Sequence, residues 1–262
     1  MITENPYSIL IGKTTDQVSK VTVCISLHNY AQYIVETLES VKKQTLTPVD
    51  LIVVEDRSTD NSLAIAETWL HENIGSFNQV YLLCHLKNQG LAQARNTAIL
   101  HAETPYLFIL DADNLIYPRC LERCLEALLS DSNAAVAYPL IEQFGEEEGV
   151  MGNVVWERSR FLKQNYIDAM SLIRRSALLQ VNGYSHLEAV GPLGWEDYEL
   201  WCKFFDAGLY GIPVPEILAK YRIHSTSMLQ SISNQSQNIR ELHYEMMRLH
   251  PWLELEHNQN FA

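Results

Sequence analysis

Short apolar runs alternate with segments of helical periodicity along the first 140 residues of the chain. Apolar residues recur three or four positions apart between the runs, which is typical of helices that bury one face. This β-α-β-α order predicts an α/β fold with a mostly parallel, doubly wound sheet covered by helices on both faces. The expected strands are Val21 to Leu27, Asp50 to Val54, Val80 to Cys84, Tyr106 to Leu110 and Ala134 to Tyr138. The helical repeats are Ile34, Leu38 and Val41, then Leu63, Ala66 and Leu70, then Leu121, Leu125 and Leu128.

The alternation weakens after Tyr138, where other patterns take over. An acidic, glycine-containing run, Glu142 to Gly149, predicts a hairpin or a mobile loop rather than a linker between independent domains. We expect a leader at 1–20, one domain with a first half at 21–140 and a second half at 141–224, and a C-terminal lid and helical tail at 225–262. Helical periodicity in that tail runs from about Asn238 to His250.

Composition narrows the class of protein. The chain has 262 residues and a net charge of −13, which argues against a nucleic acid partner because phosphate attraction needs a basic face. Neither a membrane span nor a secretory signal is visible in the sequence. Five cysteines form an odd set without a Cys-x-x-Cys pair, so neither a disulfide framework nor a zinc site is indicated. We therefore expect a cytoplasmic protein.

The most informative segment runs from Tyr106 to Asn114, an apolar strand that ends in Asp111 and Asp113. Ligands of open α/β sheets bind at the carboxyl ends of the strands. Two alternate carboxylates there can hold a hard divalent cation that keeps positions open for phosphate oxygens. The alternative is a strand followed by an ordinary Asp/Asn turn.

Three further segments lie near the ends of expected strands. The first, Cys24 to Tyr30, contains the end of the first strand and the start of the loop after it. The second, Val53 to Asp60, contains Asp56, which could present a carboxylate to a nucleobase imide or a ribose hydroxyl. In the third, Lys87 to Asn96, Gly90 opens a helix and Arg95 could contact phosphate or hold Asp111. A lone arginine is more often a surface charge. The prediction of a ligand site therefore depends on all of these segments together and not on Arg95 alone.

Six segments follow one another in this order: Ser26 to Tyr30, Val54 to Asp60, Asn88 to Asn96, Leu110 to Asn114, Gly194 to Trp201 and Tyr221 to His224. Together they resemble the motifs of a family-2 glycosyltransferase of the GT-A fold. The resemblance covers about residues 21 to 224. It implies that 21–140 binds a nucleotide-diphosphate sugar, with a UDP-sugar favoured, and that 141–224 binds the acceptor. It also implies a metal-dependent hexosyl transfer with inversion at the anomeric carbon, in glycan biosynthesis.

The resemblance assigns roles residue by residue. Donor binding falls to Ser26, Asn29, Asp56, Arg95 and Asp111. Asp113 and His224 would hold Mn²⁺ or Mg²⁺, Asp197 would be the catalytic base with Glu196 behind it, and Trp195 would stack on the acceptor. Two departures are Glu55, where many relatives carry Asp, and Asn114, which ends the aspartate motif as Asp-Asn.

The sequence leaves open the pKa of Asp197, the identity of the acceptor and the choice between an enzyme and two alternatives. The start of a helix at Trp195 should lower the pKa of Asp197, whereas burial should raise it. The acceptor, a glycan or a lipid-linked sugar reached from the inner membrane face, is not identified. Alternatives to the enzyme are a non-catalytic sugar-nucleotide-binding module on the same fold and a nucleotidyltransferase. The latter is disfavoured because the loop after the first strand, Ser26 to Ala31, contains no glycine.

Overall fold

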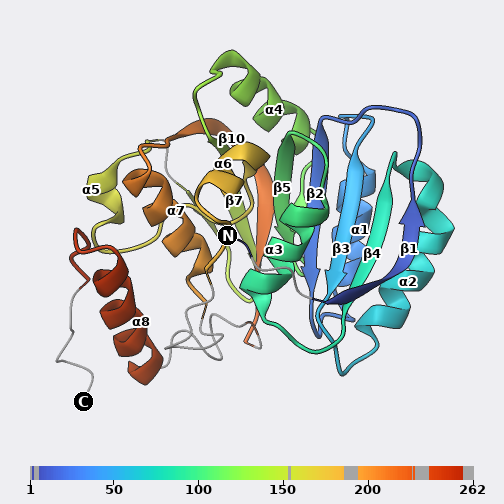
Figure 1. Cartoon of the computed structure of the whole chain (residues 1–262), viewed down its shortest axis with the longest axis horizontal. Coiled ribbons are helices and arrows are strands. Elements are labelled where there is room, and N and C mark those ends of the chain that lie inside the picture. The colour runs from blue at the N-terminus through green and yellow to red at the C-terminus, as the bar shows by residue number, and fades with distance from the viewer. Residues whose placement is uncertain are drawn as a thin grey trace.

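The computed structural model describes residue 2 and residues 6–152, 155–185, 194–225, 227 and 236–255. In this part of the chain a single sheet carries helices on both faces (Figure 1). The strands are β1 (Tyr7–Lys13), β2 (Val21–Leu27), β3 (Asp50–Glu55), β4 (Val80–His85), β5 (Tyr106–Asp111), β6 (Leu115–Ile116), β7 (Val136–Gly145), β8 (Gly149–Met151), β9 (Leu172–Arg174) and β10 (Gly211–Ile223). The helices are α1 (Ile34–Lys42), α2 (Ser62–Asn73), α3 (Leu91–His101), α4 (Cys120–Ser130), α5 (Arg158–Phe161), α6 (Arg175–Gln180), α7 (Glu196–Asp206) and α8 (Ser236–Leu249), with a 3₁₀ turn at Ile74–Ser76.

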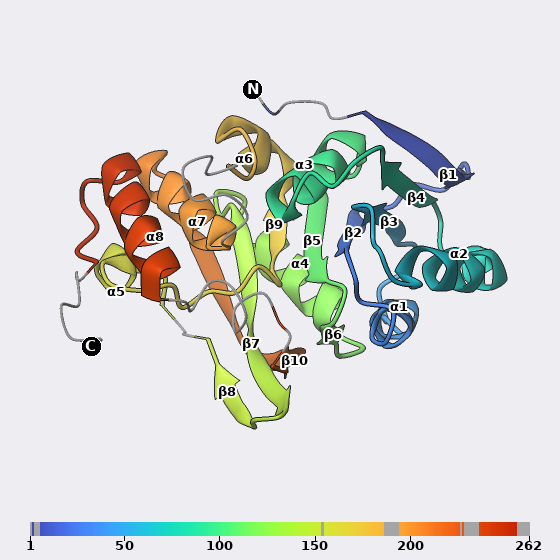
Figure 2. The same ribbon diagram turned by 90° about the horizontal axis from the view of Figure 1, so that it is seen from below.

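The sheet has the order β1-β4-β3-β2-β5-β9-β7-β10-β6, with β8 paired to β7. Strands β4, β3, β2 and β5 are neighbours and parallel, and β7 is parallel to β10. Because β9 is antiparallel to both β5 and β7, these two strands also share a direction. Figure 2 shows α3, α6 and α7 on one face and α1 and α4 on the other. The predicted α/β fold with a mostly parallel sheet is therefore confirmed.

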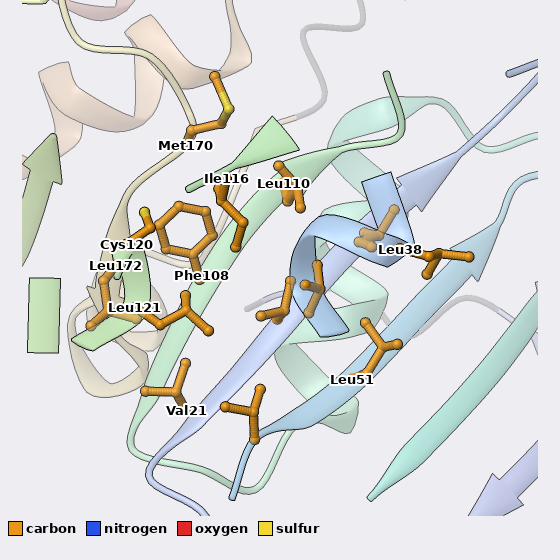
Figure 3. Packing of buried hydrophobic residues seen from close by; sticks show 14 of the residues in the cluster. Val21, Leu38, Leu51, Phe108, Leu110, Ile116, Cys120, Leu121, Met170 and Leu172 are labelled. Atoms are coloured by element: carbon orange, nitrogen blue, oxygen red, sulfur yellow. The ribbon is translucent and has the colours of Figure 1, made fainter. Parts of the chain in front are cut away.

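Each face of the sheet has its own hydrophobic core, as alternation along buried strands requires. Phe108 and Leu110 of β5 join Leu38 of α1 and Leu121 of α4 in one core (Figure 3). Leu107 and Ile109 of the same strand join the other core, with α3, α6, α7 and α8. All five cysteines are buried and free, so they pack as small apolar residues.

Strand β1 lies within the segment that we expected to be a leader. It pairs antiparallel with β4 at the edge of the sheet, and its register shifts between Ile9 and Ile11. Ile9 and Leu10, two successive residues, are both exposed, so the strand shows no clean period-two pattern. This irregularity explains why the sequence pattern did not predict it.

The acidic run forms the expected hairpin, in which β7 and β8 pair antiparallel and project beyond the sheet (Figure 2). The tail helix is also confirmed as α8. The predicted lid falls largely on residues 226 and 228–235, which lie outside the described residues. Among the residues that are described, no helix combines the length and the apolar character needed to cross a bilayer.

The tail is attached to α7 through a buried histidine. Nδ1 of His250 lies 2.6 Å from a carboxylate oxygen of Asp206, and Nε2 lies 3.7 Å from one of Glu199, both on α7. Burial lowers the pKa of His250, but the two carboxylates outweigh burial and raise it above its usual 6.5. The raised pKa favours the charged imidazole, which pairs with carboxylates of α7 and so holds the tail against that helix.

We expect His250→Asn to lower the free energy of unfolding by about 1–2 kcal/mol near pH 6 and by less near pH 9. The folded-state pKa is raised, so the stabilisation is fully present below the unfolded pKa and is lost as pH rises through the folded pKa. Urea unfolding at both pH values measures the difference. His71→Asn, at an exposed position on α2, serves as the control. An equal loss at both pH values would contradict a charged His250.

Candidate active site

The predicted donor-binding residues follow neighbouring parallel strands, so they meet at one edge of the sheet. Ser26 of β2 is directly opposite Asp111, the last residue of β5, in the β2–β5 register. Asp56 directly follows β3, and α3 with Arg95 begins after β4. The parallel order thus brings residues from four separate motifs to the same carboxyl edge.

Arg95 lies between two carboxylates from different parts of the chain. One of its guanidinium nitrogens is 2.7 Å from Asp111, and another is 2.7 Å from Glu196 at the start of α7. The Arg95 side chain is only 2% exposed, and its guanidinium lies 5.1 Å from the ring of Tyr184. Arg95 therefore holds Asp111 and joins β5 to α7.

Asp113 and His224, the two predicted metal ligands, are adjacent. Nε2 of His224 lies 3.0 Å from Oδ2 of Asp113, and the two side chains are 7% and 9% exposed respectively. The rings of Tyr30 and Tyr33 pack around the imidazole. Burial raises the pKa of Asp113, and the nearby Asp111 adds to this, while the hydrogen bond with His224 opposes it.

Arg222 and Asn114 hold this pair in place from β10 and from the loop after β5. The Arg222 side chain donates through Nε to the Asp113 carbonyl at 2.9 Å, and its backbone N–H donates to Asn114 Oδ1 at 2.9 Å. The guanidinium also lies 4.4 Å from the Tyr33 ring. Asn114 is the departure from the usual motif, and only 1% of its surface is exposed.

The donor set suits a hard divalent cation that is only partly held by protein. A carboxylate oxygen and an imidazole nitrogen are both ligands of Mn²⁺, and Mg²⁺ commonly binds one or two carboxylates together with substrate phosphates. Within the described ranges, no group of three or more His, Cys, Asp or Glu side chains is placed to hold a metal by itself. The Asp113–His224 pair therefore fits a cation that shares its ligands with a phosphate substrate.

Asp197, the predicted base, lies in the first turn of α7. Its Oδ2 accepts a hydrogen bond from Asn165 Nδ2 at 2.9 Å, and its Oδ1 accepts the N–H of Tyr198 at 2.7 Å. Burial, with the neighbouring Glu196 and Asp168, raises the pKa of Asp197 to about 8. Burial also raises the pKa of Asp168 to about 7, with Asp111 contributing. Burial and the two neighbouring carboxyl groups therefore act against ionisation of Asp197, whereas Arg95 and the Tyr198 N–H favour it.

Asp56 and Asn29 make their contacts within the protein. Asp56 is buried, and its carboxylate accepts from His85 Nδ1 at 2.7 Å and from the N–H groups of Gln89 and Gly90 at 2.8 Å. The Asn29 side-chain oxygen accepts the N–H of Thr59 at 2.7 Å. Both residues connect the loops that follow β2, β3 and β4 to one another, so any ligand contact would add to these bonds.

Glu55, the other departure, folds back onto its own turn. Its carboxylate accepts the backbone N–H groups of Arg57 at 3.1 Å and Ser58 at 2.5 Å, and it lies 3.2 Å from the Cys84 sulfur. The longer side chain is 1% exposed. The Glu55 carboxylate is therefore engaged by the turn that follows β3 and by Cys84 of β4.

Trp195 precedes α7 in a left-handed conformation, with φ of 66°. Its ring lies 5.7 Å from Tyr198 and 5.3 Å from His243 of α8, and it is partly buried. Sequence reasoning placed Asn165 and Asp168 in the expected acceptor half but assigned neither residue a role, since neither follows a recognisable strand. Their Asn-x-x-Asp spacing alone carries no signal for a site.

Two solved structures share this architecture. The S. aureus TarS 1-349 complex with UDP-GlcNAc matches with a TM-score of 0.69 and 20% identity, over 88% of this chain and 65% of that chain. The mannosyltransferase PcManGT from Pyrobaculum calidifontis, in complex with GDP-Man and Mn²⁺, matches with a TM-score of 0.64 and 18% identity, over 87% and 64% of the respective chains. The chain thus has the GT-A fold of glycosyltransferases and spans about two thirds of each of these solved chains.

The sequence comparison is more specific. The family model for glycosyl transferase family 2 matches residues 22–181. EpsE of Bacillus subtilis (strain 168), provisionally named a glycosyltransferase, is 27% identical over 207 residues, which cover 78% of this chain and 73% of that protein. The chain therefore belongs to glycosyltransferase family 2, as the six motifs predicted. Asp197 and His224 lie beyond the residues that the family model matches.

Proposed function

We propose that the protein transfers a hexose from a nucleotide-diphosphate sugar to an acceptor hydroxyl, with a divalent metal and with inversion at the anomeric carbon. The observation that carries the proposal is the ion bridge of Arg95, which connects Asp111 on the donor side to the helix that bears Asp197. A donor-side carboxylate and a base with a raised pKa are thereby held within one site. That arrangement suits a direct displacement between two bound substrates.

On the donor side, Asp113 and His224 would hold Mn²⁺ or Mg²⁺. A bound divalent cation supplies Lewis-acid neutralisation of the charge that grows on the leaving diphosphate. Asp111 is held by Arg95 and is 25% exposed, so its carboxylate can accept a hydrogen bond from a hydroxyl of the ribose or of the donor sugar. Ser26, Asn29 and Asp56 line the neighbouring strand ends, where the nucleoside would lie.

On the acceptor side, Asp197 would take the proton of the attacking hydroxyl. The oxygen then forms its bond to the anomeric carbon as the bond to the diphosphate breaks, which inverts the configuration at that carbon. Because the pKa of Asp197 is raised to about 8, its carboxylate is a stronger base than an ordinary aspartate. Glu196 forms an ion pair with Arg95 and would position the first turn of α7, which bears Asp197. Trp195 would pack against a glycan or lipid-linked acceptor.

The comparisons bear on the base of the donor nucleotide and on the metal. TarS was solved with UDP-GlcNAc, which favours a UDP-sugar, whereas PcManGT was solved with GDP-Man. PcManGT also contained Mn²⁺, which supports a divalent metal here. A non-catalytic sugar-nucleotide-binding module remains the alternative, and it would retain donor binding without turnover.

We expect one of UDP, GDP, dTDP and CDP to raise the unfolding temperature in the presence of Mn²⁺, and Asp113→Asn to abolish the metal-dependent part. A ligand at a hundredfold excess over its Kd adds about 2.7 kcal/mol of stability, which thermal unfolding detects readily. Asp16→Asn, at an exposed position away from the catalytic edge, is the matched control and should keep the full shift.

The outcomes separate the candidates. A shift that needs Mn²⁺ and Asp113 supports the metal-dependent donor site, and turnover with any acceptor then excludes the non-catalytic module. A shift that is independent of metal and unchanged in Asp113→Asn would remove Asp113 from the metal site. The absence of any shift with all four nucleotides would count against the proposed donor class.

A further inference from the structure

The loop between α5 and β9 contains two polar side chains that are oriented in the same way. Asn165 Oδ1 accepts the N–H of Ile167 at 3.2 Å, and Asp168 Oδ1 accepts the N–H of Met170 at 2.8 Å. In each case the side chain bonds the backbone two residues further on, as in an Asx turn. Each turn therefore uses one polar atom of its side chain, and for Asn165 the second atom, Nδ2, reaches a different partner.

This loop is also tied firmly to the elements around the site. The indole N–H of Trp201, on α7, donates to the Ile167 carbonyl at 2.8 Å in the buried interior. On the other side, the N–H of Ile109 in β5 donates to the Ser171 carbonyl at 3.3 Å. The loop therefore has a defined position relative to both α7 and β5.

The identity of the Asn165 amide atoms follows from these contacts. Because Oδ1 accepts the Ile167 N–H, the atom that faces Asp197 must be Nδ2, which is a donor only. Nδ2 lies 2.9 Å from Asp197 Oδ2. With the Tyr198 N–H on Oδ1, both oxygens of the Asp197 carboxylate have a fixed donor, so its plane is set.

We propose that Asn165 is the positioning residue of the catalytic base, because it fixes the Asp197 carboxylate and stabilises its ionised form for proton transfer from the acceptor. This inference rests on the proposed function, in which Asp197 is the base. It extends the site to a loop that contains none of the family motifs found in the sequence.

The surroundings of Asp197 explain why such a donor matters. Glu196 on the same helix and Asp168 on the loop disfavour the charged carboxylate, whereas Arg95 on α3 favours it. The Asn165 amide is a neutral hydrogen-bond donor, and like Arg95 it favours the ionised form of Asp197. Tyr184, Tyr221 and the Cys202 thiol also interact electrostatically with Asp197, and none of these three groups carries a positive charge. Removal of the amide donor should therefore make Asp197 harder to ionise.

The decisive variant is Asn165→Asp, which keeps the shape and the Oδ1 acceptor for the Ile167 N–H but replaces the donor by an acceptor. We expect kcat to fall at least about tenfold, the donor Kd to stay within about twofold, and the acid limb of the pH profile to move to higher pH. Asn165→Ser is the second variant, because its hydroxyl can still accept from the backbone but is too short to reach Asp197. Asn133→Asp, at an exposed position, is the control.

A second readout does not depend on turnover. Carboxyl-carbon NMR of Asp197 in the wild type and in both variants should show a higher pKa when Asn165 is replaced. Wild-type kcat and an unchanged Asp197 pKa in both variants would overturn the role of Asn165 while leaving the proposed function intact. If instead the wild type transfers no sugar to any acceptor, the proposed function fails, and an unchanged Asp197 pKa in the variants would overturn the hydrogen-bond role as well.

Discussion

Replacing Asp197 with Asn is expected to lower kcat by about 10²- to 10⁴-fold, the typical contribution of a general base. Asparagine has nearly the same shape but cannot accept the acceptor's proton. Donor binding should persist, because Asp113 and His224 are separate from Asp197. Steady-state kinetics with the donor identified by thermal unfolding, together with the nucleotide Kd, test this expectation. The exposed Asp16→Asn variant should behave like the wild type.

The pH dependence of turnover should also report on Asp197. Asp197 must be ionised to act as a base, and burial, Glu196 and Asp168 raise its pKa to about 8. In the free enzyme, kcat/KM should therefore fall as the pH drops below about 8, and residual activity of Asp197→Asn should lack this limb. Normal turnover in Asp197→Asn, or a wild-type profile that stays flat down to about pH 5, would show that another group is the base.

Replacing Arg95 with Met is expected to lower the free energy of unfolding by about 3–5 kcal/mol, the usual cost of removing one partner of a buried ion pair. The guanidinium is almost fully buried, and its loss leaves Asp111 and Glu196 without their cation. Methionine retains much of the side-chain volume, so the loss reports on charge more than on a cavity. Denaturant unfolding at neutral pH measures it.

Two variants make the Arg95 experiment specific. Arg119→Met removes an exposed pair with Glu122 and should change stability by less than about 0.5 kcal/mol. Adding Glu196→Gln to Arg95→Met should recover part of the loss, because one buried charge then disappears. A loss in Arg95→Met no larger than that in Arg119→Met would mean that the buried bridge contributes nothing to stability.

Much of the fold followed from local patterns. The apolar runs that became β2 and β5 are buried on both faces, so composition over five to seven residues was enough to identify them. The exposed edge strand β1 escaped prediction because its bulge breaks the alternation. Edge strands need only one partner, so their own pattern constrains them less.

The candidate site was predictable in its residues more than in its contacts. Asp111 and Asp113 stand out because carboxylates abruptly end an apolar strand, and a strand end has a known place in an α/β sheet. Whether Arg95 would face phosphate or Asp111 depended on Glu196, which lies 101 residues away in the chain. No local pattern contains that information.

By itself, the sequence determined the alternation of strands and helices, the parallel order and the residue types gathered at the carboxyl edge of the sheet. These properties follow from hydrophobic periodicity and from chemistry that is local in the chain. Only the tertiary structure decided that Asp197 has a raised pKa, that Arg95 bridges two carboxylates and that Asn165 faces the base. The physical reason is that burial and Coulomb interactions depend on distance in space, and the packing of distant segments sets those distances.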